Sequence, residues 1–98
     1  MELDLLQKWV NKETYFMQVK RIISVFNKQD ETIVRELDIS LTSLDLDKLK
    51  EIFNPNIEDP LMYLVYRIGK DEAKELKKYV NEDFDFEKYL YQLDCFTI

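Results

Sequence analysis

The sequence predicts an α+β fold, a mostly antiparallel sheet of about four strands with two or three helices packed on it, in the order α-β-β-α-β-α-β. Three observations support this prediction. Residues 15–26 and 32–39 are rich in branched and aromatic side chains and are separated by a polar turn. Residues 46–53 carry apolar side chains at helical spacing. Residues 84–96 return to the composition of a loop followed by a strand.

The first two strands are expected to form a hairpin. Residues 15–26 place apolar side chains on both faces of a strand, whereas residues 32–39 alternate apolar and polar side chains. The connection between them includes Asn27 and Asp30, two residue types that favour turns. Because the connection is so short, the two strands should pair antiparallel.

The first helix after the hairpin is defined at both ends. Thr42 and Asp45 approximate a capping arrangement at its start. Asn54-Pro55 ends it, because proline lacks an N–H donor and disfavours helical geometry in the residue before it. Its buried stripe consists of Leu46, Leu49, Ile52 and Phe53.

The run LMYLVYRI, residues 61–68, is almost wholly apolar. It predicts a strand that is covered on both sides or that keeps one face for a partner. Gly69 ends this strand, and Asp71 is the expected N-cap of a helix over residues 72–80. The final strand is expected to place Tyr89, Tyr91, Leu93 and Cys95 on one face, with Leu90 and Phe96 on the other.

The length of 98 residues predicts a single domain, 1–98, with a core over residues 15–96 and a helical N-terminal extension over residues 1–14. Within the extension, Leu3, Leu6, Trp9 and Val10 share one helical stripe. A helix this short is stable only when it packs on something else, here the sheet. Trp9 is its expected anchor, although an exposed Trp at an interface is the alternative.

The charge balance bears on the kind of partner. Twenty acidic and 14 basic residues give a net charge of −6, which disfavours binding to nucleic acid and is compatible with a basic protein partner. The same charge also keeps a small domain soluble without any partner. Residues 1–10 lack the features of a signal peptide, no apolar run is long enough to span a membrane, and Cys95 is the single cysteine. The expected location is the cytoplasm.

Residue types give little support to catalysis. The chain contains no histidine, Gly69 is its one glycine, and Cys95 has no histidine to activate it. We therefore predict no enzyme activity, no catalytic residue, no metal and no cofactor. The carboxylates are the remaining polar candidates, and we weigh them first as solvated charge and next as a recognition patch. Their use in metal binding or catalysis is the least favoured reading.

Tyrosines accompany the carboxylates in two places. Tyrosine beside carboxylate suits a surface that binds a basic target, but tyrosine is also common at the rim of a small core, and both readings stay open. The predicted partner-binding residues are Glu58, Asp59, Tyr63, Tyr66, Glu82, Asp83, Asp85, Glu87, Tyr89 and Tyr91.

Four segments, VFNKQDETIV, LDLDKLKEIF, DPLMYLVYRI and FDFEKYLYQL, together resemble small bacterial immunity proteins of polymorphic toxin systems. A typical member has a strand ending in Phe-Asp-Lys, a helix opening with Leu-Asp-Leu, a loop reading Asp-Pro-Met-Tyr, and Phe-Asp-Phe before an aromatic strand. The matching positions are 26–28, 44–53, Asp59, Pro60, Met62, Tyr63, Tyr66 and 84–91. Asn27 replaces the usual acidic residue, Leu61 is an insertion, and residues 1–14 have no counterpart.

The resemblance implies an immunity protein that binds and neutralises a cognate toxin domain, such as that of a contact-dependent growth inhibition system. The toxin would be a nuclease whose basic active-site surface is occluded, and the free immunity protein would be a monomer or weak dimer. The alternative is a non-catalytic regulatory or adaptor module that binds an endogenous protein or self-associates through residues 61–66. A metal-dependent hydrolase would require a cation at the acidic clusters.

Overall fold

The computed structural model describes residues 18–98, and within them the α+β prediction is confirmed. The predicted N-terminal helix lies outside the described residues. The elements, in chain order, are β1 (Val19–Asn27), β2 (Ile33–Asp38), the 3₁₀ helix η1 (Ile39–Leu41), α2 (Leu46–Phe53), β3 (Tyr66–Arg67), α3 (Lys70–Leu76) and β4 (Tyr89–Thr97). No helix in this part of the chain is long and apolar enough to cross a membrane.

The four described strands form one antiparallel sheet in the order β2-β1-β4-β3. β1 and β4 pair along their whole length, from Val19 opposite Thr97 to Asn27 opposite Tyr89. The predicted β1–β2 hairpin is also present, with a shift of register between Val25 and Phe26. The two long strands therefore form the centre of the sheet.

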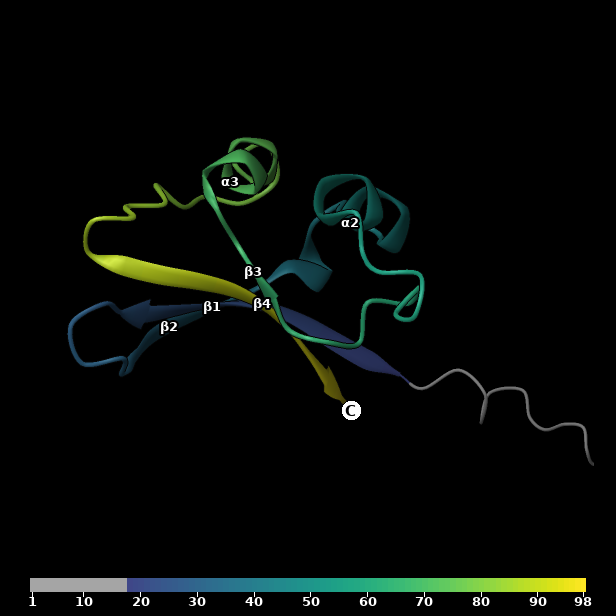
Figure 1. Cartoon of the computed structure of the whole chain (residues 1–98), viewed down its shortest axis with the longest axis horizontal. Helices are drawn as coiled ribbons and strands as arrows, with labels where there is room; N and C mark the ends of the chain where they lie inside the picture. Colours follow the sequence, from purple (N-terminus) through teal and green to yellow (C-terminus); the bar gives the residue numbers. More distant parts are fainter. Residues whose placement is uncertain (1–17) are drawn as a thin grey trace, which may run out of the picture.

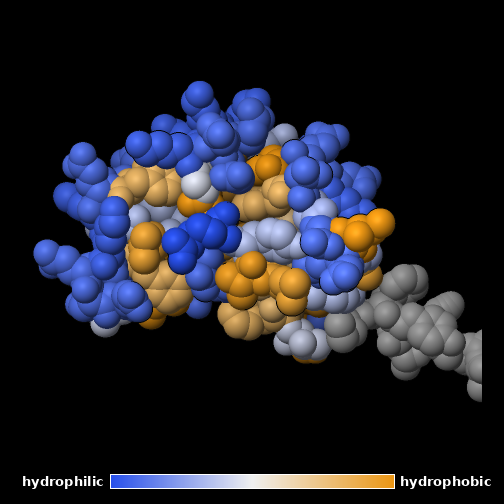
Figure 2. Space-filling model, in the orientation of Figure 1, coloured by the Kyte–Doolittle hydropathy of each residue, from blue (hydrophilic) through white to orange (hydrophobic). Residues whose placement is uncertain are grey.

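Both described helices cover the same face of the sheet, as Figure 1 shows. Ile23 and Val25 of β1 and Tyr91 and Leu93 of β4 point toward the helices and are almost completely buried. Leu49 of α2 and Ala73 and Leu76 of α3 complete the centre of this core. Figure 2 shows mostly polar side chains over the helices and a group of apolar side chains at the lower centre. The predicted assignment of β4 residues to two faces is confirmed.

Local side-chain chemistry sets the bounds of α2, which ends where predicted but begins three residues later than a cap at Thr42 would place it. Asp45 is the N-cap, and its carboxylate accepts a hydrogen bond from the Lys48 N–H at 2.9 Å. Asn54 adopts the left-handed conformation at the end of the helix, with φ of 48°. Thr42 does not cap α2, because its hydroxyl donates instead to the carbonyl of Ile39 and ends η1.

The prediction of one long strand over residues 61–68 is wrong. Only Tyr66 and Arg67 pair with β4, opposite Leu93 and Gln92. Upstream of them, the carboxylate of the buried Asp59 accepts hydrogen bonds from the backbone N–H groups of two residues of the run. A side chain has thus taken the donors that a strand would have given to its neighbour. The run is consequently a loop with a two-residue strand at its end.

The second described helix begins earlier and ends earlier than predicted. α3 starts after Gly69, and the Glu72 carboxylate accepts a hydrogen bond from the Gly69 N–H at 2.9 Å. Asp71 therefore lies in the first turn, where it faces the positive end of the helix dipole, and is not the N-cap. The chain after Leu76 continues as turns, which lead to a loop over residues 81–88.

Candidate functional site

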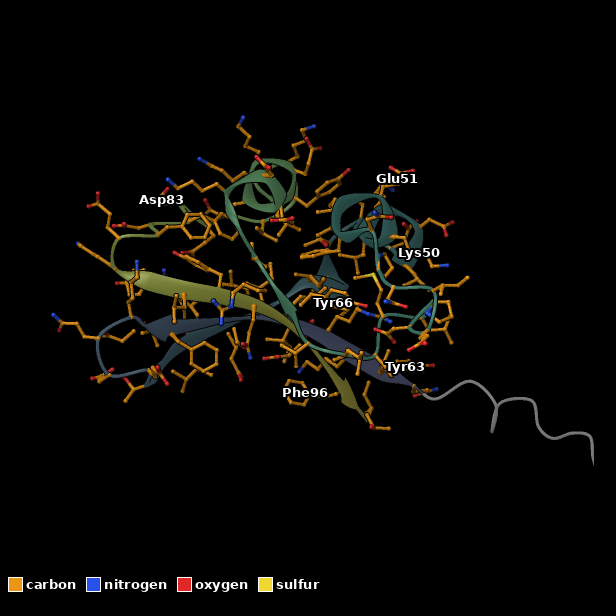
Figure 3. All side chains as sticks on the ribbon, viewed as in Figure 1. Lys50, Glu51, Tyr63, Tyr66, Asp83 and Phe96 are labelled. Carbon is orange, nitrogen blue, oxygen red and sulfur yellow. The ribbon has the colours of Figure 1, made fainter. Side chains whose placement is uncertain are left out.

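The ten predicted partner-binding residues fall into two groups. Glu58, Asp59, Tyr63 and Tyr66 belong to the segment between α2 and the end of β3, whereas the other six belong to the loop before β4 and to β4 itself. Asp83 and Tyr63 lie toward opposite ends of the molecule in Figure 3. The structure does not bring the ten residues together as one surface.

Two members of the first group hold the loop together from inside. The Asp59 carboxylate accepts hydrogen bonds from the N–H groups of Tyr63 (2.9 Å) and Leu64 (3.1 Å) and from the Tyr66 hydroxyl (2.5 Å). Burial alone would raise the pKa of Asp59, but these hydrogen bonds outweigh it and hold the pKa below its usual value. Burial, aided by the Asp59 charge, raises the pKa of Tyr66 to about 12. In this group Glu58 is exposed, Tyr63 and Tyr66 are half-buried and Asp59 is buried.

The second group forms the candidate site, which we term the acidic loop, residues 81–88. Its side chains alternate between the protein and solvent although the segment is not a strand. The Glu82 side chain is only 6% exposed, Phe84 is buried and Phe86 is half-buried. The alternate carboxylates face outward, with Asp83 and Glu87 exposed and Asp85 half-buried.

An ion pair ties the acidic loop to β2. Arg35 donates two hydrogen bonds to the Glu82 carboxylate, from Nε to Oε1 at 3.2 Å and from Nη2 to Oε2 at 2.6 Å. The same guanidinium lies 5.2 Å from the centre of the Tyr89 ring, within the range of a cation–π contact. Hydrogen bonding to Glu82 raises the pKa of Arg35 further above its already high value. Glu82 is therefore a neutralised anchor within the loop.

Tyr91 of β4 connects the two halves of the loop. Its hydroxyl donates to Glu82 Oε2 at 3.1 Å and accepts a hydrogen bond from the Asp85 N–H at 2.9 Å. Burial raises the pKa of Tyr91 to about 12, and the nearby Glu82 carboxylate acts in the same direction. Tyr91 is only 1% exposed, so it supports the loop from beneath.

Aromatic packing fixes the middle of the acidic loop. The Phe84 ring lies 4.9 Å from the ring of Tyr91, centre to centre, and Phe86 packs against the edge of Tyr91 at 5.3 Å. Phe84 has a φ of 57°, a left-handed conformation that is unfavourable for a large side chain. Packing of its ring in the core offsets this strain. The loop is thereby held in one backbone conformation, with its outward carboxylates fixed in direction.

The outward carboxylates border two open hollows. One of about 500 Å³ is lined by Arg35, Asn81, Glu82, Asp83, Asp85, Lys88 and Tyr89. The other, of about 370 Å³, is lined by Glu87 and Tyr89 together with Lys28 and Lys88. Arg35 neutralises Glu82, so the negative charge of the first hollow comes from Asp83 and Asp85, with Lys88 as the one remaining cation of its lining. In the second hollow the two lysines outnumber the one carboxylate, so the acidic character of the site belongs to Asp83 and Asp85. These groups accept hydrogen bonds and attract cations, which suits the lysine and arginine side chains of a basic protein.

The rest of the described chain offers little further chemistry. Within residues 18–98, no group of three or more His, Cys, Asp or Glu side chains is arranged to hold a metal ion. Cys95 is half-buried, and burial raises the pKa of its thiol.

A comparison with known protein families identifies the family of this chain. Residues 20–94 match the model of a family described as a domain of unknown function, DUF7683. The chain belongs to this family. The matched residues of this DUF7683 member include both described helices, the acidic loop and nearly all of the sheet. No curated protein and no solved structure matches the chain.

Sequence reasoning missed the residue that organises the site. Arg35 was not among the predicted residues, yet it connects β2 to Glu82 and Tyr89. The signal was the alternation of β2, in which Arg35 falls on the same side as the inward-facing Leu37. A cation on the inner face of a strand needs a carboxylate partner from another segment, and Glu82 supplies it.

Proposed function

We propose that this DUF7683 member is an immunity protein that acts in the cytoplasm. It binds and neutralises a cognate toxin domain, and it does so without catalysis and without a cofactor. The toxin is a nuclease, and the acidic loop occupies the basic surface on which the nuclease binds nucleic acid. One observation carries the proposal: Asp83, Asp85 and Glu87 face outward from a loop whose backbone is held by the Arg35–Glu82 pair and by Phe84.

A pre-shaped loop favours tight binding. Ordering a flexible loop during association costs free energy, and that cost is reduced when the loop already has its bound conformation. Carboxylates resemble phosphates in accepting charge-assisted hydrogen bonds from arginine and lysine. Fixed carboxylates at the acidic loop therefore suit a groove that normally holds a phosphate backbone.

Net charge and sequence resemblance support the same class of partner. A net charge of −6 attracts a basic protein over long distances and speeds the encounter. The four segments that resemble immunity proteins of polymorphic toxin systems include FDFEKYLYQL, which spans most of the acidic loop and the start of β4.

The proposal is tested by rescue of growth. The candidate toxin is sought as the C-terminal domain of a large secreted protein encoded beside this gene, and it is expressed from an inducible promoter in a host that lacks this chain. We expect growth arrest that is relieved when this chain is co-expressed, and a one-to-one complex on purification. Continued arrest at full expression of this chain, with no complex, would contradict the proposal.

The position of the interface is tested by reversing charge at the acidic loop. We expect the double variant Asp83→Lys, Asp85→Lys to lose rescue and to bind the toxin domain at least about a hundredfold more weakly, since like charges then meet in the groove. The matched control is Glu51→Lys, Glu58→Lys, which changes net charge equally at two exposed positions of α2 and the loop after it. Equal loss in both variants would place the interface elsewhere.

A further inference from the structure

The face of the sheet opposite α2 and α3, which we term the open face, has no described element over it (Figure 1). Residues that pair across two strands point to the same side of a sheet. The pairs Phe26–Leu90, Ser24–Gln92, Ile22–Asp94 and Lys20–Phe96 alternate with the core pairs, so they lie on the open face.

Exposed apolar side chains lie at the two ends of the open face. Phe96 is 48% exposed at one end, and Ile33, which pairs with Phe26, is 52% exposed at the other. Between them, Ile22, Ser24 and Asp94 are buried, and Phe26, Leu90 and Arg67 line a hollow of about 200 Å³ with Glu31 and Gln92. Phe96 points down from the sheet in Figure 3. Large apolar side chains left exposed on one face of a sheet are typical of a surface that another segment covers.

We propose that the N-terminal segment of this same chain covers the open face, with the stripe of Leu3, Leu6, Trp9 and Val10 packed on Phe96 and Phe26. The sequence of residues 2–10 predicts a helix with one apolar side, and a helix of nine residues needs a surface to pack on. This inference does not depend on the proposed toxin partner.

The point at which the segment joins the sheet supports the proposal. Ile98 donates a backbone hydrogen bond to the carbonyl of Gln18 at 2.9 Å, which fixes the chain immediately before β1. Lys20, two residues later, pairs with Phe96. The segment therefore enters at the end of the open face that Phe96 occupies.

The connection is long enough for the segment to reach any part of this face. Residues 11–18 span at most about 29 Å when extended, and a helix over residues 2–10 is about 13 Å long. The nine residues of β1 extend over about 30 Å. The tether also holds the segment at an effective concentration of roughly millimolar, well above that of a second copy in dilute solution.

The test uses the intrinsic fluorescence of the full chain, because Trp9 is its one tryptophan. We expect emission typical of a buried indole and a low acrylamide quenching constant, both independent of protein concentration. Phe96→Asp, and separately Ile33→Asp, should shift the emission to the red and raise the quenching constant toward that of free tryptophan amide. The control Ile57→Asp, at a position 91% exposed in the loop after α2, should leave both unchanged.

Far-UV circular dichroism and thermal unfolding establish that each variant is folded. Positions 96 and 33 are both exposed enough to accept a charge.

Three results would overturn the proposal. The first is emission of a fully solvated indole in the unmodified chain. The second is no response of Trp9 in either folded open-face variant. The third is a blue shift that appears only as the mass measured by light scattering doubles, since a second copy would then occupy the face.

Discussion

A single carboxylate, that of Asp59, decides the path of the chain before β3. It is 7% exposed and accepts three hydrogen bonds, two from backbone N–H groups and one from the Tyr66 hydroxyl. Met62, between Asp59 and these donors in the chain, has a φ of 55° and is buried. Because the carboxylate fixes this tight turn, its contribution to stability should be large for one polar residue.

The variant Asp59→Asn tests that contribution. Asparagine keeps one acceptor oxygen and loses the charge, so at least one buried donor is left unpaired. We expect the free energy of unfolding to fall by about 2 kcal/mol, measured by urea denaturation. The neighbouring control Glu58→Gln, at an exposed position, should change it by less than about 0.5 kcal/mol. Equal effects at both positions would contradict the structural role of Asp59.

Asp59 also makes stability depend on pH in a defined direction. Its pKa in the folded protein is lowered, so at acid pH the unfolded chain binds a proton more readily than the folded one. The stabilisation is fully present above the unfolded pKa of about 3.9 and is lost as pH falls through the folded pKa. The stability difference between the unmodified chain and Asp59→Asn should therefore shrink in urea titrations below about pH 4. A constant difference across this range would contradict the prediction.

At the scale of elements, inward-facing side chains hold the backbone of the acidic loop in one conformation although the loop is not a strand. Glu82, Phe84 and Phe86 face inward and contact β2, β4 or one another, so every second side chain is an anchor. The residues between them are then directed to solvent without support of their own. The Arg35–Glu82 pair is the contact that links the loop to a strand on the far side of β1.

A double-mutant cycle measures that link. We expect Arg35→Ala and Glu82→Ala to show a coupling energy of about 1–2 kcal/mol, because the pair is bidentate and the Glu82 side chain is only 6% exposed. The matched control is the Glu75–Lys78 pair of the α3 region, at 2.8 Å but exposed on both sides, where coupling should be below about 0.5 kcal/mol. Amide hydrogen exchange of residues 83–85 should accelerate in Arg35→Ala and in Glu82→Ala, and should not change when the Glu75–Lys78 pair is broken. Unchanged exchange there would mean that other contacts hold the loop.

These contacts also explain which parts of the fold and of the candidate site can be predicted from the sequence. The hairpin, the buried stripe and C-terminal end of α2 and the faces of β4 follow from local periodicity and from Pro55 after Asn54, whereas the cap of α2 is Asp45 and not the predicted Thr42. The strand predicted over residues 61–68 fails because Asp59 competes for its backbone donors, and composition carries no sign of that competition. In the site, Asp83 and Glu87 are exposed as a binding surface requires, whereas Glu82 is internal because Arg35 reaches it from β2, and Tyr91 because its ring packs in the core. Such pairing between distant segments is set by the tertiary fold.

On the scale of the whole molecule, the described helices lie on one side of the sheet and the acidic loop lies at one end (Figure 1). The acidic loop and the open face are therefore separate surfaces with different chemistry, one carboxylate-rich and one apolar. A basic partner at the loop and the N-terminal segment on the sheet are compatible with each other. The proposal of a toxin partner at the acidic loop and the proposal that the N-terminal segment covers the open face can therefore be tested separately.

The net charge of −6 gives the proposed association a characteristic dependence on salt. Raising ionic strength from about 0.01 M to 0.15 M shortens the screening length from roughly 30 Å to 8 Å, so long-range attraction is largely removed while contacts within the complex remain. We expect the association rate constant with the toxin domain to fall at least about tenfold over this range, with a much smaller change in the dissociation rate constant. Stopped-flow mixing measures both.

The two charge-reversal variants then separate steering from contact. Asp83→Lys, Asp85→Lys and the control Glu51→Lys, Glu58→Lys change net charge equally, so both should slow association and weaken its dependence on salt. Only the acidic-loop variant should also raise the dissociation rate constant, since only its carboxylates lie within the proposed interface. An association rate that is independent of salt in the unmodified chain would exclude a basic partner. A faster dissociation in the control alone would move the contact to the other end of the molecule, where Glu58 and Tyr63 are.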